Sequence, residues 1–159
     1  MEKKKILFVC LGNICRSPAA EAVLKGMAER EGLAELLEID SAGLTDYHEG
    51  EPADQRMQEH AKKRGYQLTS ISRPVDPNRD FDYYDMIIGM DDQNIRELEL
   101  LAEGTRAASK IFKMTDFCHD CSLDEVPDPY YGGAEGFEMA LDLLEKSCQG
   151  LIDFLKEQV

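Results

Sequence analysis

The chain has 159 residues, with 18 Lys or Arg against 32 Asp or Glu, so its formal net charge at pH 7 is −14. This length is typical of one domain with a sizeable core, and we expect residues 1–159 to form a single domain. The negative charge argues against nucleic acid or an anionic membrane as the main partner. No apolar run approaches the roughly 20 residues that span a bilayer, and residues 1–5 are too short and polar for a signal peptide, so we expect a cytoplasmic protein.

Strand and helix signals alternate along the first half of the chain. Residues 6–9 (Ile-Leu-Phe-Val) predict a buried strand, and Pro18 predicts the first position of a helix that ends near Gly32. Residues 36–41 predict a second strand. Glu51-Pro52 predicts the start of a helix that stops at Gly65. Residues 66–81 contain two prolines and predict extended or loop structure.

The second half continues the alternation. Residues 84–90 predict a third strand, Asp91 or Asp92 caps a helix with apolar residues at helical spacing, and residues 109–112 predict a short fourth strand. An apolar stripe from Phe137 to Leu155 predicts a final amphipathic helix. The alternation indicates an α/β fold, with a parallel sheet covered by helices on both faces. In such folds the ligand site lies beyond the carboxyl ends of the strands.

The segment between the first strand and the first helix predicts a phosphate-binding loop. It reads Val-Cys-Leu-Gly-Asn-Ile-Cys-Arg-Ser-Pro over residues 9–18. Gly12 and Asn13 can adopt the left-handed backbone that curls such a loop, so that successive N–H groups converge on one point. The positive end of the following helix faces the same point. We therefore expect a phosphate or sulfate anion to bind there.

This loop begins with a thiol and ends with a guanidinium, in a Cys-x5-Arg spacing. Around a tetrahedral phosphate, Arg16 can bind two equatorial oxygens with its planar fork while the Cys10 sulfur lies in line with the leaving oxygen. A helix N-terminus and a cationic neighbour both favour a thiolate. We expect Cys10 to be a thiolate at neutral pH, with the Ser17 hydroxyl donating to its sulfur. These residues suit nucleophilic attack on phosphorus.

A second functional segment is predicted between the fourth strand and the last helix. Residues 113–133 show no strong periodic pattern, and loops this long inside compact domains are usually functional or disordered. Asp128 lies between Pro127 and Pro129, which restrict the backbone on both sides, and two tyrosines follow. A carboxylic acid fixed in this way can protonate the leaving oxygen of an aryl phosphate and then activate water.

The five cysteines need separate interpretations, because an odd number does not suggest a disulfide framework. Cys148 falls in the apolar stripe of the last helix and is expected in the core. Cys118 and Cys121 lack the further ligands of a zinc site, and we expect a surface loop that holds two thiols. A curled loop would bring Cys15 near Cys10, and a reversible Cys10–Cys15 bond could protect the nucleophile from over-oxidation.

The two motifs, Val-Cys-Leu-Gly-Asn-Ile-Cys-Arg-Ser-Pro and Asp-Pro-Tyr-Tyr, resemble those of the low-molecular-weight protein tyrosine phosphatases, over almost the whole chain. The resemblance implies a three-layer α/β/α fold with a four-stranded parallel sheet in the order 2-1-3-4. It implies a hydrolase that dephosphorylates phosphotyrosine proteins or peptides through a phosphocysteine intermediate, and we expect this hydrolase to be a cytoplasmic monomer. It implies neither metal nor cofactor.

The same resemblance assigns roles to individual residues. Cys10 would be the nucleophile, Arg16 the clamp for the transition state, Asp128 the general acid and then base, and Ser17 the stabiliser of the thiolate. The phosphate-binding loop and its support would comprise Leu11, Gly12, Asn13, Ile14, Cys15, Ser17 and Ser41. The pocket walls would be Leu11, Ile14, Tyr47, Tyr130 and Tyr131, and His48 would lie in the segment that tunes substrate choice.

The chain departs from the family at one place. Many relatives carry a histidine shortly before the arginine that matches Arg73, whereas this chain reads Leu-Thr-Ser-Ile-Ser over residues 68–72. We expect Ser70 or Ser72 to take over the support of the loop.

Two other functions share the loop motif. Thiol-dependent arsenate reductases need cysteines that relay a disulfide, and Cys118 and Cys121 are the candidates here. A non-catalytic phosphotyrosine-binding module is the second alternative. Turnover of an aryl phosphate without metal or thiol partner would distinguish the phosphatase from both.

Overall fold

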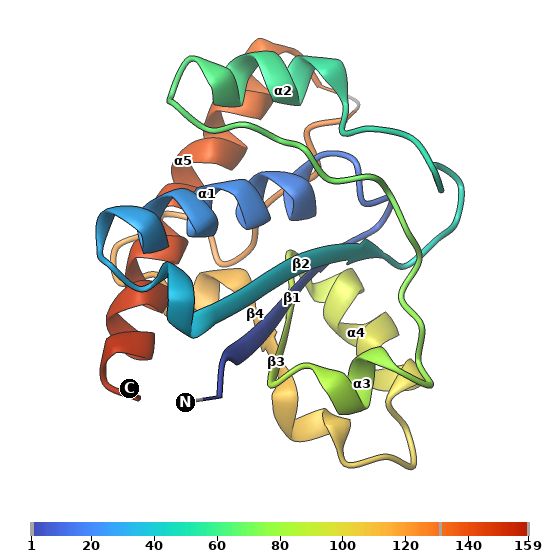
Figure 1. The fold of residues 1–159 in the computed structure, drawn as a ribbon. Helices are drawn as coiled ribbons and strands as arrows, with labels where there is room; N and C mark the ends of the chain where they lie inside the picture. The colour runs from blue at the N-terminus through green and yellow to red at the C-terminus, as the bar shows by residue number, and fades with distance from the viewer. Residues whose placement is uncertain (1, 131, 159) are drawn as a thin grey trace.

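The computed structural model describes residues 2–130 and 132–158, which form three layers around a parallel sheet (Figure 1). The sheet has four strands in the order β2-β1-β3-β4, which confirms the predicted order. Phe8 pairs with Ser41 and Cys10 with Gly43, so β1 and β2 end side by side. The strands are β1 (Lys4–Cys10), β2 (Leu37–Gly43), β3 (Met86–Gly89) and β4 (Ile111–Lys113).

Helices cover both faces of the sheet, because β1 sends fully buried apolar side chains to each side. Ile6 and Phe8 pack in one core and Leu7 and Val9 in the other. The first core lies under α1 (Arg16–Arg30), α2 (Gln55–Lys62) and α5 (Ala134–Lys156), and the second under α3 (Asp80–Tyr83) and α4 (Asp92–Leu101). The described residues also form three short 3-10 helices: η1 (Ala34–Leu36), η2 (Ala107–Lys110) and η3 (Met114–Phe117).

Several element boundaries differ from the sequence prediction for local reasons. The second helix begins at Gln55 and not at Glu51-Pro52, because the Asp54 side chain accepts from two backbone N–H groups of its first turn. Pro52 instead forms an isolated bridge with Ile71. The fourth strand begins at Ile111 because η2 occupies the preceding residues. Helix α3, which begins at Asp80 near the end of the 66–81 segment, was not predicted.

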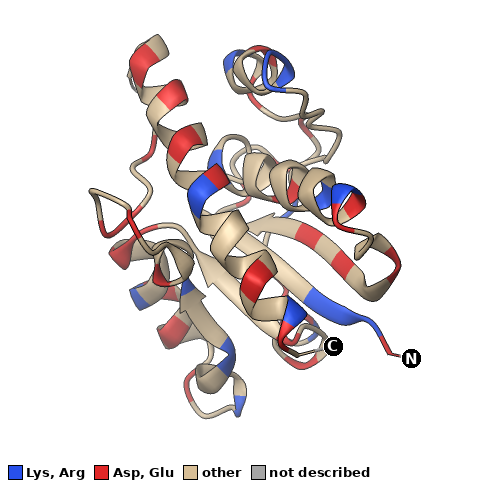
Figure 2. Ribbon diagram, turned by 90° about the vertical axis from the view of Figure 1, so that its left-hand side faces the viewer, with Lys and Arg blue, Asp and Glu red and all other residues tan. Residues whose placement is uncertain are grey.

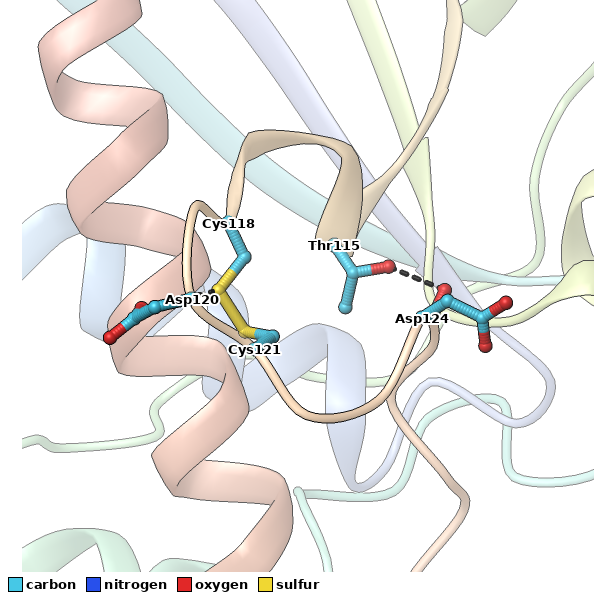
Figure 3. Close-up of a disulfide and its surroundings, with 5 residues drawn as sticks. All are labelled: Thr115, Cys118, Asp120, Cys121 and Asp124. Atoms are coloured by element: carbon cyan, nitrogen blue, oxygen red, sulfur yellow. Dashed lines mark hydrogen bonds between the residues drawn. A yellow bond between two sulfur atoms is a disulfide. The ribbon is translucent and has the colours of Figure 1, made fainter.

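The expectation of two free thiols at Cys118 and Cys121 is wrong. The structure joins them in a disulfide, with Cα atoms 5.8 Å apart, inside the range that a disulfide bridges (Figure 3). The bonded turn follows η3, and the hydroxyl of Thr115 in η3 donates across the turn to the backbone carbonyl of Asp124 at 2.6 Å. Together these bonds fix the start of the segment that leads to Asp128. Cys148 is fully buried, as predicted.

Charged side chains hold α2 against α5. Figure 2 shows acidic residues recurring along α5, the helix that ends at the C-terminus, while basic residues gather at the start of β1. Arg64, just after α2, forms ion pairs with Glu138, Asp142 and Glu145 on α5. This clamp fixes α2, and with it the β2–α2 connection, relative to the sheet. Within the described ranges, no helix is long and apolar enough to cross a membrane.

The contact between α5 and η3 depends on Gly150, where an added Cβ would lie 1.7 Å from the Phe117 carbonyl oxygen. We expect Gly150→Ala to lower the free energy of unfolding by about 2 kcal/mol, because the backbone must move to relieve the overlap. Urea titration followed by circular dichroism measures this change. Gly136→Ala in the same helix is the matched control, since its Cβ would meet only Pro129 at an ordinary 3.7 Å. Equal stabilities of the two variants would contradict the prediction.

Candidate active site

The loop between β1 and α1 curls tightly and is held by hydrogen bonds from neighbouring segments. Asn13 has φ 57°, the left-handed conformation that the sequence predicted for this part of the loop. The loop's carbonyl groups bond outward: the Ile14 carbonyl accepts from the Asp54 N–H at 2.7 Å and the Gly12 carbonyl from the Ser72 hydroxyl at 3.1 Å. Carbonyls that bond outward leave the loop's N–H groups to the anion, as in other anion-binding loops.

Arg16 lies buried at the start of α1, with 2% of its side chain exposed. Its Nη1 donates to Asp91 Oδ2 at 2.6 Å and to the Val126 carbonyl at 2.8 Å. Burial opposes the charge, but the negative groups of Cys10, Asp91 and Asp128 outweigh it and hold the pKa of Arg16 above its ordinary value. One edge of the guanidinium is thus fixed by protein acceptors.

The other edge of the Arg16 guanidinium is formed by Nε and Nη2. Its Nε is buried without a hydrogen-bond partner within residues 2–130 and 132–158, and its Nη2 lies 3.5 Å from Asp128 Oδ2. A buried N–H group rarely lacks an acceptor unless a ligand supplies one. Nε and Nη2 form the planar fork that binds two oxygens of a phosphate. This orphaned group indicates an oxyanion site.

Cys10 lies beside this fork, with its sulfur buried among hydrogen-bond donors. Its Sγ is 3.1 Å from the Ser17 Oγ, and the Ser17 backbone N–H donates to it at 3.5 Å. The Asn13 amide donates to Ser17 Oγ at 2.9 Å and to Ser41 Oγ at 3.0 Å. The Asn13 Oδ1 in turn accepts from the Arg73 backbone N–H at 2.9 Å. The structure therefore brings together the thiol and the three polar side chains predicted to support it.

Of the two serines expected to replace the missing histidine, Ser72 makes the contact with the loop through Gly12. Arg73 is fixed by ion pairs to Asp40 and to the fully buried Asp80. The segment that supports the loop is therefore held by the ion pairs of the Arg73 side chain and by the bond from the Arg73 N–H to Asn13.

A pocket opens above Cys10 and is walled mainly by apolar side chains. The aromatic rings of His48 and Tyr130 lie 6.1 Å apart at its side, and Tyr47 is 78% exposed. Tyr131 lies outside the described residues. A pocket with a buried thiol at its base and exposed aromatic walls fits a flat aryl ester. Its lining comprises Cys10, Leu11, Gly12, Ile14, Cys15, Thr45, Tyr47, His48, Asp128 and Tyr130.

Asp128 reaches this pocket from the long segment after β4. Val126 anchors the segment, since its N–H donates to the Met90 carbonyl at 2.8 Å and its carbonyl accepts from Arg16. Two residues later, Asp128 Oδ1 accepts from the Tyr130 N–H at 3.1 Å, which fixes the carboxylate at the pocket wall with 30% of the side chain exposed. A half-buried carboxylate beside the thiol and guanidinium can exchange protons with a bound ligand and with water.

Sequence reasoning missed three residues of the site. Asp91 was predicted only as a helix cap, yet it also holds Arg16. Its place directly after β3, at the carboxyl edge of the sheet, was the available signal. Thr45 lines the pocket, and Arg56 donates to the Tyr130 carbonyl at 3.0 Å. Neither of these two lies in a recognisable motif.

Comparison with known proteins gives one consistent result. The sequence profile of the family described as low molecular weight phosphotyrosine protein phosphatase matches residues 5–159. A relative described as a putative low molecular weight protein-tyrosine-phosphatase, from Synechocystis, is 42% identical over 155 residues and aligns with 98% of each chain.

Solved structures agree with the sequence comparison. A crystal structure of a protein tyrosine phosphatase from Entamoeba histolytica, with Hepes in its active site, superposes with a TM-score of 0.94 at 51% identity, over 98% of this chain and 99% of that one. YfkJ from Bacillus subtilis gives a TM-score of 0.91 at 36% identity, over 99% and 98%. With the loop, the buried arginine and the matching fold in place, this chain belongs to the low-molecular-weight protein tyrosine phosphatase family.

Proposed function

We propose that Cys10, Arg16 and Asp128 carry out the family's reaction in this chain: hydrolysis of phosphotyrosine in two steps through a cysteinyl phosphate. The observation that carries the assignment is the buried Nε of Arg16, which lies beside the Cys10 sulfur and has no hydrogen-bond partner among the residues that the structure describes. An oxyanion that fills this site places its phosphorus next to the thiol. The pocket above it then holds the aryl group.

In the first step the Cys10 sulfur attacks phosphorus and the bond to the tyrosyl oxygen breaks. Arg16 holds two equatorial oxygens through Nε and Nη2, whose positions are set by the bonds of Nη1 to Asp91 and Val126. Asp128 gives its proton to the leaving oxygen. Because the guanidinium is already oriented, it needs no reorganisation as charge moves onto the phosphoryl oxygens.

In the second step water attacks the cysteinyl phosphate. The Asp128 carboxylate takes a proton from that water, the sulfur–phosphorus bond breaks, and inorganic phosphate leaves. Cys10 returns to the thiolate, which Ser17 stabilises through its hydroxyl and its N–H. One carboxylate therefore serves as acid and then as base.

The pocket favours phosphotyrosine in proteins or peptides over phosphoserine, because Cys10 is only 3% exposed and a short side chain would not reach it. Leu11, Ile14, Tyr47 and Tyr130 would flank the ring, with His48 beside them, and Tyr131 remains a predicted wall. We propose that the chain acts as a monomer and as a single domain. We propose the cytoplasm as its compartment.

Burst-phase hydrolysis of para-nitrophenyl phosphate in EDTA tests the proposal. We expect Cys10→Ser to be inactive, and Asp128→Asn to lose about 10²–10⁴-fold in rate together with the basic limb of the pH profile. The wild type should form a phosphoenzyme, and the phosphate should remain bound to Cys10 after the protein is denatured. Activity retained by Cys10→Ser, or activity that EDTA abolishes, would contradict the mechanism.

The bond from Asp91 to Arg16 yields a separate prediction. Asp91→Asn keeps a side chain that can cap α4 but removes the charge that holds Nη1. We expect kcat/KM to fall by about 10–100-fold, because loss of one partner leaves a buried charge poorly compensated. Steady-state kinetics with an aryl phosphate measure the change.

Asp92→Asn is the matched control. Asp92 lies in the same helix turn, its side chain is exposed, and it pairs with Lys113 of β4. Its kcat/KM should stay within about twofold of the wild type, as exposed pairs contribute little. Equal losses in the two variants would show that Asp91 acts on the helix and not on Arg16.

A further inference from the structure

The segment that carries Asp128 is held on both sides by backbone hydrogen bonds to other parts of the molecule. Two residues before Asp128, the Val126 carbonyl accepts from the buried Arg16. Two residues after it, the Tyr130 carbonyl accepts from Arg56 Nη2 of α2 at 3.0 Å. The first of these bonds belongs to the mechanism described above. The second joins the segment to α2, and the mechanism gives it no role.

Tyr130 also determines which oxygen of Asp128 faces the substrate. Its N–H donates to Asp128 Oδ1 at 3.1 Å. The other oxygen, Oδ2, lies 3.5 Å from Arg16 Nη2. The protonated carboxyl group carries its proton on Oδ2, because a donor already faces Oδ1. Since Arg16 Nη2 is one of the two groups proposed to bind the phosphoryl oxygens, the position of Tyr130 sets the direction in which the acid gives its proton.

Arg56 is itself fixed to the phosphate-binding loop through Asp54. Its Nε donates to Asp54 Oδ1 at 3.3 Å and its Nη2 to Asp54 Oδ2 at 3.1 Å, a two-point contact that sets the plane of the guanidinium. The Asp54 N–H donates to the Ile14 carbonyl of the loop at 2.7 Å. The second proton of Nη2 is directed at the Tyr130 carbonyl. Arg56 therefore joins the loop that holds the nucleophile to the segment that holds the acid.

The guanidinium of Arg56 also lies against two aromatic rings, 5.5 Å from the centroid of Tyr130 and 4.8 Å from that of Phe137 on α5. Contacts of a cation with the faces of aromatic rings favour one orientation of the side chain. However, 48% of the Arg56 side chain is exposed, and ion pairs exposed to this degree add little to the stability of a fold. The contacts of Arg56 therefore fix positions more than they stabilise the protein.

We propose that Arg56 is a positioning residue for the general acid: it holds the Tyr130 carbonyl at a fixed place relative to the phosphate-binding loop, and so places Asp128 Oδ2 opposite the leaving oxygen. This role rests on the proposed function of Asp128, and Arg56 itself transfers no proton. The ion pair between Arg16 and Asp128 cannot replace the anchor in the first step, because the acid is then protonated and uncharged.

The dependence of the rate on the leaving group separates positioning of the acid from other effects of Arg56. Phenol, like the tyrosine side chain, has a pKa of about 10, so release of phenol from phenyl phosphate needs the acid. The para-nitrophenolate ion is a weaker base and needs the acid less. Both substrates carry the same charged group on one aromatic ring. Loss of a positive charge or of packing at the pocket wall would therefore lower kcat/KM for both alike.

We expect Arg56→Met to lower kcat/KM about 30-fold for phenyl phosphate and about threefold for para-nitrophenyl phosphate, so that their ratio changes about tenfold. This constant covers the steps up to release of the phenol, in which the acid gives its proton. Arg64→Met is the matched control, because it removes a guanidinium whose ion-pair partners all lie on α5. The ratio of the two substrates in this control should stay within about twofold of the wild-type ratio.

Two further variants test whether the loss passes through Asp128. In the double variant Arg56→Met, Asp128→Asn, the acid is already absent. The first substitution should then lower kcat/KM for phenyl phosphate by less than about threefold relative to Asp128→Asn alone. Asp54→Asn keeps a cap for α2 but weakens the hold on Arg56. It should change the ratio of the two substrates in the same direction, even if Arg56→Met folds poorly as judged by circular dichroism.

Equal losses for the two substrates in Arg56→Met, or the full loss again in the double variant, would overturn the positioning role. An equal rise in KM for both substrates with unchanged kcat would overturn it as well, because Arg56 would then bind the substrate. These results leave the phosphatase assignment intact as long as Cys10→Ser is inactive. If Cys10→Ser kept its activity, or if Asp128→Asn gave the wild-type ratio of the two substrates, the proposed function itself would fail.

Discussion

The burial of one guanidinium governs the structure of this site. Arg16 is almost wholly removed from water, and such a charge is costly unless every part of it is compensated. Asp91 and the Val126 carbonyl satisfy one edge. The other edge has an unpartnered Nε within the described part of the chain and is completed only when an anion occupies the loop. The fold therefore favours the binding of a phosphoryl group, because its oxygens give the buried Nε–H group an acceptor.

The surrounding elements serve to keep that edge open. The ends of β1, β2 and β3 bring Cys10, Ser41 and Asp91 to one edge of the sheet, although they are far apart in sequence. The turn closed by the Cys118–Cys121 disulfide and the anchored Val126 deliver Asp128 to the same place. Arg16 therefore links the first helix to the segment that carries the acid, and the loop, the sheet edge and the acid cannot be altered independently.

How much of this could be predicted from the sequence depends on how local each feature is. Residues 10–17 form one continuous motif, and the prolines beside Asp128 mark that residue as fixed, so the sequence alone was enough to propose a nucleophile, a clamp and an acid. Asp91 and Arg56 join the site only because the fold brings their elements together. The start of α2 was misplaced because the Asp54 cap outweighed the Pro52 signal. The pairing of Cys118 with Cys121 depends on a turn that spacing alone did not specify.

The Nε–H signal of Arg16 tests most directly whether the edge formed by its Nε and Nη2 binds the phosphoryl group. Proton–nitrogen NMR spectra of the arginine side chains, with Arg16→Lys to assign the resonance, would be recorded during titration with inorganic phosphate. We expect a saturable downfield shift of the Arg16 signal, because its Nε–H gains an acceptor. The signals of Arg64 and Arg73, whose guanidinium groups are held in ion pairs away from the loop, should stay unchanged. An Arg16 signal that does not move while phosphate inhibits the enzyme would contradict it.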